Sequence, residues 1–217
     1  MRLFRFIKNL PQKHLLALSI LSAVFYNSWI LGYFLNRSQI NNAYFSVLQI
    51  PGRPYYLLYI ILDVICGLLI ILIGLYLLKT IKLDKKTIIY YLGFGLFIIL
   101  DAIYPISNQC STTISKCGYS LRQIFSYHDV LGIIMFTLIF LILKNISKIA
   151  RRHHNVLYRN IIKYNFYLYI LSLISLVASV PFDLFTDITQ AVVIILTSAT
   201  ISITPLVIIL DKKMNLN

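Results

Sequence analysis

Four ionisable side chains in apolar stretches of this sequence could carry chemistry: Asp63, Asp101, His128 and Asp129. A histidine oriented by a carboxylate can act as a general base, which makes His128 with Asp101 or Asp129 the candidate catalytic pair for a hydrolysis. The nucleophile would be Ser126 or a water molecule, although residues two apart on a helix point away from each other. A lone carboxylate such as Asp63 is costly inside a membrane, so we expect it to be ion-paired, protonated or beside a wet cavity.

These side chains lie on segments long enough to cross a lipid bilayer. The chain has 217 residues, is 59% hydrophobic and has a mean hydropathy of +0.81, which is too apolar for a soluble domain. Open strands are excluded, because each unpaired backbone group in lipid costs several kcal/mol. The sequence therefore predicts an all-α membrane protein, a single bundle of six transmembrane helices at about residues 15–36, 55–78, 87–104, 121–143, 165–180 and 188–210.

The basic residues predict how these helices are oriented. Most of the 20 Lys and Arg residues fall in the amino-terminal segment, the second and fourth loops and the carboxy-terminal tail. Such residues favour the cytoplasmic side, so both termini are expected in the cytoplasm, with loops 37–54, 105–123 and 181–187 outside the cell membrane. The net charge of +13 alone would suit a nucleic-acid binder. Short basic clusters between apolar runs instead predict contact with membrane lipids and no nucleic acid.

Two cysteines lie in the second outer loop. Cys110 and Cys117 could form a disulfide in an oxidising compartment, which would contribute about 2 to 3 kcal/mol if unstrained. A metal pair is less favoured, because zinc sites add closely spaced ligands and His128 is the only histidine expected on the outer side. No metal or cofactor is therefore predicted.

The last predicted helix has its own polar pattern. Asp187 with Gln190 three residues later fits a capping box at its start, and Pro205 should kink or fray its inner end. Small side chains let helix backbones approach closely, so a stripe of hydroxyls on one face predicts a packing seam in preference to an ion path. The stripe consists of Thr197, Thr200 and Thr204.

Three stretches of the chain share a pattern with a membrane family. They are Tyr26-Asn27-Ser28-Trp29, then Pro51-Gly52-Arg53-Pro54-Tyr55 followed by Leu62-Asp63-Val64, and last Asp101 with Cys110, Cys117 and Ser126-x-His128-Asp129. Together they resemble the bacterial and archaeal family catalogued as domain of unknown function 998. The resemblance implies a six-helix membrane fold and no assigned reaction.

Candidate ligand-binding residues come from the same stretches: Asp63, Arg53, Trp29 and Asn27. Arg53 departs from the family pattern, which often has a glutamine there. Pro51-Gly52 suits a type II turn, because glycine tolerates the positive φ that this turn requires. Such a turn would fold the first outer loop back over the bundle.

Three functions are compatible with these residues. The first is binding of a lipid or small amphiphile at a polar pocket near the outer face. The second is an intramembrane lipid-modifying hydrolase that uses His128 with Asp101 or Asp129. The third is a cation- or proton-coupled transporter that uses Asp63, which is less favoured because transporters often have broken helices and paired repeats and the sequence shows neither.

Overall fold

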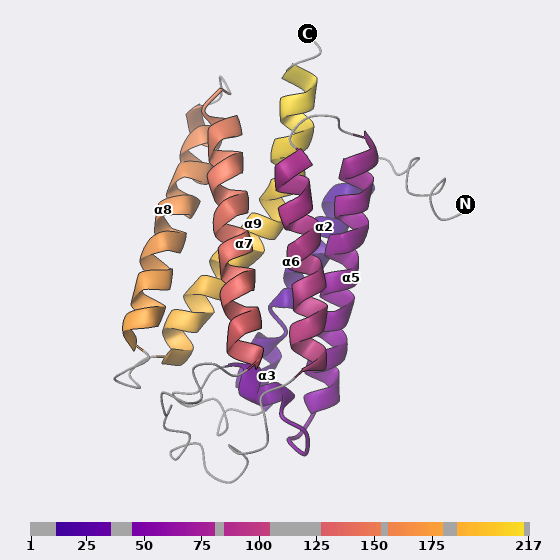
Figure 1. Cartoon of the computed structure of the whole chain (residues 1–217), viewed down its shortest axis with the longest axis vertical. Helices are drawn as coiled ribbons and strands as arrows, with labels where there is room; N and C mark the ends of the chain where they lie inside the picture. Colours follow the sequence, from indigo (N-terminus) through magenta and orange to yellow (C-terminus); the bar gives the residue numbers. More distant parts are fainter. Residues whose placement is uncertain are drawn as a thin grey trace, which may run out of the picture.

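Six apolar helical segments, each a candidate membrane span, run along the bundle (Figure 1). We call each of these segments a passage. The computed structural model describes residues 12–35, 45–80, 85–104, 127–152, 156–179 and 186–214. Each passage is long and apolar enough to cross a membrane, and these described residues contain no strand. The predicted all-helical membrane architecture is therefore confirmed.

The first passage consists of two helices, α2 (Gln12–Tyr26) and α3 (Trp29–Leu35), and a short 3-10 helix, η1 (Phe45–Gln49), follows. The other passages are α5 (Tyr56–Thr80), α6 (Lys85–Ile103), α7 (Tyr127–Ala150), α8 (Val156–Ser179) and α9 (Thr186–Met214). The end of α7 and the start of α8 extend about two turns beyond the predicted spans. Hydropathy marks only the part of a helix in lipid, whereas backbone hydrogen bonds continue the helix past charged residues.

Close backbone contact joins α5 to α6. A Cβ atom built on Gly67 would lie 2.6 Å from the carbonyl oxygen of Gly95, and one built on Gly95 would lie 2.9 Å from the carbonyl oxygen of Gly67. Only residues without a side chain permit this approach. The pair therefore fixes the crossing of the two helices that carry Asp63 and Asp101.

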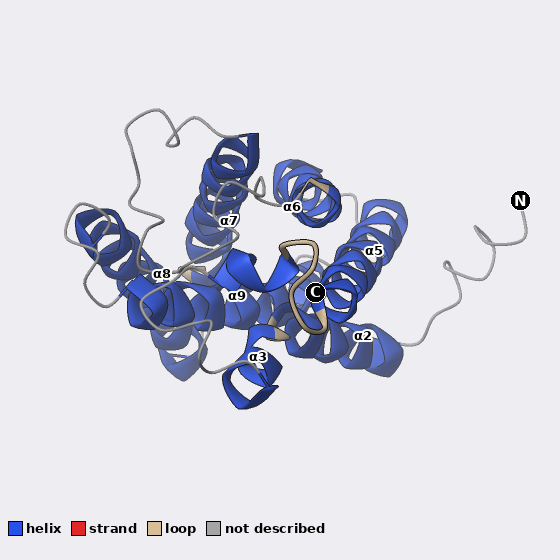
Figure 2. Cartoon of the chain, turned by 90° about the horizontal axis from the view of Figure 1, so that it is seen from below, coloured by secondary structure: helices blue, strands red, loops and turns tan. Residues whose placement is uncertain are grey.

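Helix α9 lies among the other helices and contacts α2, α5, α7 and α8 (Figure 2). Its hydroxyl stripe is fully buried, which confirms the predicted packing seam. Thr204 donates to the carbonyl of Thr200 in its own helix, and Asn165 of α8 donates to Oγ1 of Thr200 at 3.0 Å. These bonds satisfy polar groups in the interior of the bundle.

Pro205 lies inside α9, and the helix continues beyond it to Met214, so of the two predicted outcomes, a kink or a frayed end, fraying does not occur. Proline has no N–H to donate to the carbonyl four residues earlier, which is that of Ile201. The hydroxyl of Tyr91 on α6 donates to this carbonyl at 3.1 Å. A side chain from a neighbouring helix thus satisfies the acceptor that proline leaves unpaired.

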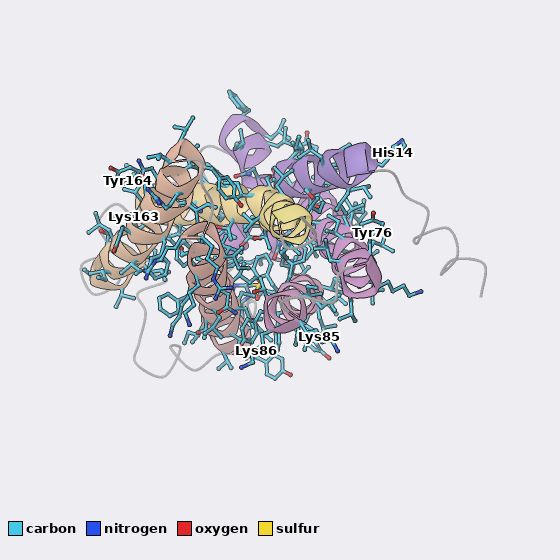
Figure 3. All side chains as sticks on the ribbon, turned by 90° about the horizontal axis from the view of Figure 1, so that it is seen from above. His14, Tyr76, Lys85, Lys86, Lys163 and Tyr164 are labelled. Carbon is cyan, nitrogen blue, oxygen red and sulfur yellow. The ribbon has the colours of Figure 1, made fainter. Side chains whose placement is uncertain are left out.

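The two ends of the bundle differ in character. We call the end that holds α3, η1 and the start of α5 the η1 end; it is the lower end in Figure 1. At the opposite end, Lys85 and Lys86 of α6 and Lys163 of α8 lie around the rim (Figure 3). Most described Lys and Arg side chains belong to helix ends at this opposite end.

Candidate functional site

A cavity of about 300 Å³ opens within the η1 end of the bundle. Residues from the break between α2 and α3, from η1 and from five of the long helices surround it. The lining combines two carboxyl groups and an imidazole with aromatic and aliphatic walls. Among its residues are Tyr26, Ser28, Trp29, Phe45, Gln49, Tyr59, Asp63, Asp101, His128, Gly132, Ile133, Phe136, Leu176, Val177 and Gln190.

Asp63 faces this cavity from α5, and two neutral side chains hold its carboxyl group. Nε2 of Gln49 donates to Oδ2, and Oγ of Ser28 lies 3.5 Å from Oδ1. Gln49 comes from η1 and Ser28 from the break in the first passage. The carboxyl group of Asp63 thus lies beside a cavity. Its two donors orient it without cancelling a negative charge.

The first passage is interrupted at Asn27 and Ser28. Backbone N–H groups there bond carbonyls three residues earlier, as from Ser28 to Phe25 at 3.0 Å and from Ile30 to Asn27 at 3.0 Å. The Asn27 amide donates to the carbonyl of Ala23 at 2.7 Å and to Oγ of Ser198 at 2.6 Å. The expectation of unbroken helices is therefore wrong, because hydrogen bonds to a distant helix stabilise a break that hydropathy does not reveal.

Asn27 and Trp29 have different places at this break. Oδ1 of Asn27 accepts a hydrogen bond from Nε1 of Trp29 at 3.1 Å. Trp29 lines the cavity, whereas Asn27 is absent from the lining and positions its neighbour. Of these two predicted ligand-binding residues, only Trp29 can touch a ligand in the cavity.

The first loop folds back into the bundle, as predicted from Pro51-Gly52. Gly52 has a φ of 89°, and the N–H of Arg53 donates to the carbonyl of Ile50 at 3.1 Å. This is the pattern of a type II turn. Arg53 is partly buried within the turn and does not line the cavity.

Two contacts seat η1 against the helices. The ring of Phe45 stacks on that of Trp29, with ring centroids 4.5 Å apart. The backbone N–H of Phe45 donates to Oε1 of Gln190 at 2.8 Å. Gln190 was expected to complete a capping box with Asp187, but its side chain instead holds η1. These two contacts hold η1 where Gln49 lies beside Asp63.

Asp101 and His128 face each other across α6 and α7. Nδ1 of His128 lies 2.9 Å from Oδ1 of Asp101, and the side chains are only 14% and 17% exposed, respectively. The contact becomes an ion pair when the imidazole is protonated. The predicted pairing of these two residues is thus present in the structure, and both line the same cavity as Asp63.

Cys110, Cys117 and Ser126 lie outside the described residues, and the side chain of Asp129 is also not described. Among the residues that are described, no group of three His, Cys, Asp or Glu side chains could hold a metal ion. Cys66 is a buried free thiol that donates to the carbonyl of Ser22 at 3.2 Å.

Sequence reasoning missed Gln49, Ser28 and Gly132. Gln49 carried one usable signal, since it is a polar residue two positions before a turn predicted to fold the loop inward. Ser28 belonged to a quoted motif without an assigned role. Nothing in the sequence around Gly132 indicates that it lines a cavity. Only the structure shows this, because a Cβ atom built on Gly132 meets no atom within 4 Å.

A family model described as "Protein of unknown function (DUF998)" matches residues 19–206. No curated protein and no solved structure matches the chain.

The Gln49–Asp63 bond is testable by a double-mutant cycle. Gln49→Leu leaves a carboxyl group without its closest donor and should lower the free energy of unfolding by about 1 to 3 kcal/mol. Combining it with Asp63→Leu should cost less than the sum of the single changes, because no unpaired partner is left. Thermal unfolding in detergent measures each variant, with the exposed Thr137→Val as a control expected to change little. Strictly additive costs would contradict the coupling.

Proposed function

The chain belongs to the DUF998 family, and because that description assigns no reaction, we propose a function from the cavity itself. The protein binds a lipid or small amphiphile, with the polar head near Asp63 and the chain along the apolar walls. The observation that carries this proposal is the shared space: two carboxyl groups and a histidine line one cavity with aromatic and aliphatic side chains. Sites of this kind bury the apolar part of a ligand and use a few polar groups to orient it.

Access from the bilayer is supported by the wall that α7 and α8 provide. Ile133 of α7 and Val177 of α8 line the cavity, yet they are 60% and 70% exposed. A lining residue with so much exposed surface lies at an opening. In a membrane this side of the bundle faces acyl chains, so a ligand could enter laterally between the two helices.

The cavity would face the outside of the cell membrane. The basic rim at the opposite end supports this orientation, since Lys and Arg favour the cytoplasmic side (Figure 3). In a background with the three native cysteines replaced, Lys116→Cys should react with an impermeant thiol reagent in intact cells, and Arg152→Cys should react only after lysis. The reverse pattern would place the cavity on the cytoplasmic side.

Binding should depend on the open space beside Gly132. Gly132→Leu inserts a side chain where nothing lies within 4 Å and should exclude ligand from the cavity. Native mass spectrometry of the purified protein should show a bound amphiphile whose occupancy falls at least about tenfold, the effect of about 1.4 kcal/mol. Val130→Leu, at an exposed position of the same helix, is the matched control and should retain the ligand. Equal occupancy in the two variants would exclude the cavity as the binding site.

The geometry of Asp101 and His128 favours a second candidate, ester hydrolysis. Nδ1 of His128 lies 2.9 Å from Oδ1 of Asp101, and an imidazole with its proton on Nδ1 carries its lone pair on Nε2. That nitrogen could take a proton from water as the water oxygen attacks the acyl carbon of an ester. When the bond from this carbon to the alcohol oxygen breaks, the imidazolium returns the proton to the leaving oxygen, which yields a carboxylic acid and an alcohol.

Incubation of the purified protein with ester lipids would test the hydrolase candidate. Mass spectrometry should detect acid and alcohol products, and His128→Ala should slow their formation about 10² to 10⁴-fold. Asp187→Asn, at the same end of the bundle but outside the cavity lining, is the control. Products that form equally with His128→Ala would exclude this mechanism, and the absence of products would leave binding as the function.

A further inference from the structure

Resting on the proposed function, we infer the charge of the ligand that the cavity takes: the head of the amphiphile carries an ammonium group. The inference starts from the sign of the lining. Asp63 and Asp101 contribute two carboxyl groups, and His128 can contribute at most one positive charge. In the part of the lining that the structure describes, there is no Lys or Arg.

The two carboxyl groups differ in what compensates them. Asp101 has the imidazole of His128 at 2.9 Å, which can supply a positive charge. Asp63 has the amide of Gln49 and the hydroxyl of Ser28, which are both neutral. In a low-dielectric interior a carboxyl group stays ionised only beside a charge partner, and otherwise it takes up a proton. A ligand cation beside Asp63 would supply that partner.

The aromatic lining suits the same ligand. Trp29 and Phe45 are stacked beside the cavity, and the rings of Tyr26 and Tyr59 also line it. The faces of such rings attract ammonium groups, and aromatic residues commonly surround quaternary ammonium ligands. The carboxyl groups and the aromatic rings of the lining thus both favour a ligand with an ammonium group. An anionic head without a cation would instead face two carboxyl groups and no compensating Lys or Arg among the described lining residues.

Two sources could provide the ammonium group: a zwitterionic membrane lipid or a free cationic amphiphile. A set of octyl compounds that differ only in the head separates them. The set consists of octyltrimethylammonium, octylphosphocholine, octyl sulfate and octyl glucoside, each brominated on the chain next to the head, where bromine quenches indole fluorescence on contact. The chain has a single tryptophan, Trp29, which lines the cavity, so quenching reports occupancy directly.

Titration of the full chain in nanodiscs tests the inference. The trimethylammonium compound should quench Trp29 at a concentration at least about tenfold lower than the sulfate does, the scale of one charge-assisted interaction. Asp63→Asn should remove this preference, whereas Asp63→Glu and the control Asp187→Asn should keep it. If the phosphocholine compound binds as well as the trimethylammonium compound, the source is a zwitterionic lipid. If only the trimethylammonium compound binds well, the source is a free cationic amphiphile.

Contrary outcomes separate this inference from the function on which it rests. Equal or tighter binding of the sulfate or the glucoside, still blocked by Gly132→Leu, would overturn the ammonium head and leave amphiphile binding intact. Quenching that Gly132→Leu does not reduce would overturn amphiphile binding in the cavity. Titration of the unaltered protein with the four octyl compounds measures the charge preference even if Asp63→Asn fails to fold.

Discussion

The carboxyl group of Asp63 imposes the main constraint on the η1 end of this bundle. It lies within a membrane-spanning helix, where an unpaired carboxyl group is costly, so the chain must bring donors to it. Gln49 reaches it because η1 folds inward, and Ser28 reaches it because the first passage breaks at that residue. The break, the inward loop and the cavity between them are therefore parts of one arrangement around a single polar group.

Much of this arrangement was predictable from local properties. Apolar length predicted the six passages, and proline followed by glycine predicted the inward turn at residues 51 and 52. The positions of Asp63, Asp101 and His128 near the same ends of their helices predicted that they would meet. For the passages and the turn, the physical cause lies within a few residues of the feature, so the sequence pattern contains it.

The remainder depends on contacts between distant segments. The break at Asn27 is held by Ser198, which is 171 positions away in the sequence. Gln190 was expected to cap its own helix, but its side chain binds the backbone of Phe45 because the folded bundle brings η1 within reach. When a side chain has two possible hydrogen-bond partners, the packing of the helices decides which one it binds. Neither the periodicity nor the hydropathy of the sequence predicts that packing. The cavity, including the open space beside Gly132, is likewise a property of the assembled helices.

The hydrogen bond from Tyr91 to the carbonyl of Ile201 links the identities of two residues on different helices. The phenol is useful there because position 205 is proline and supplies no amide proton. In a relative with alanine at position 205, the helix would satisfy its own carbonyl, and phenylalanine would serve as well as tyrosine at position 91. Relatives that keep the proline should therefore keep the tyrosine, whereas relatives without the proline can carry either residue at position 91.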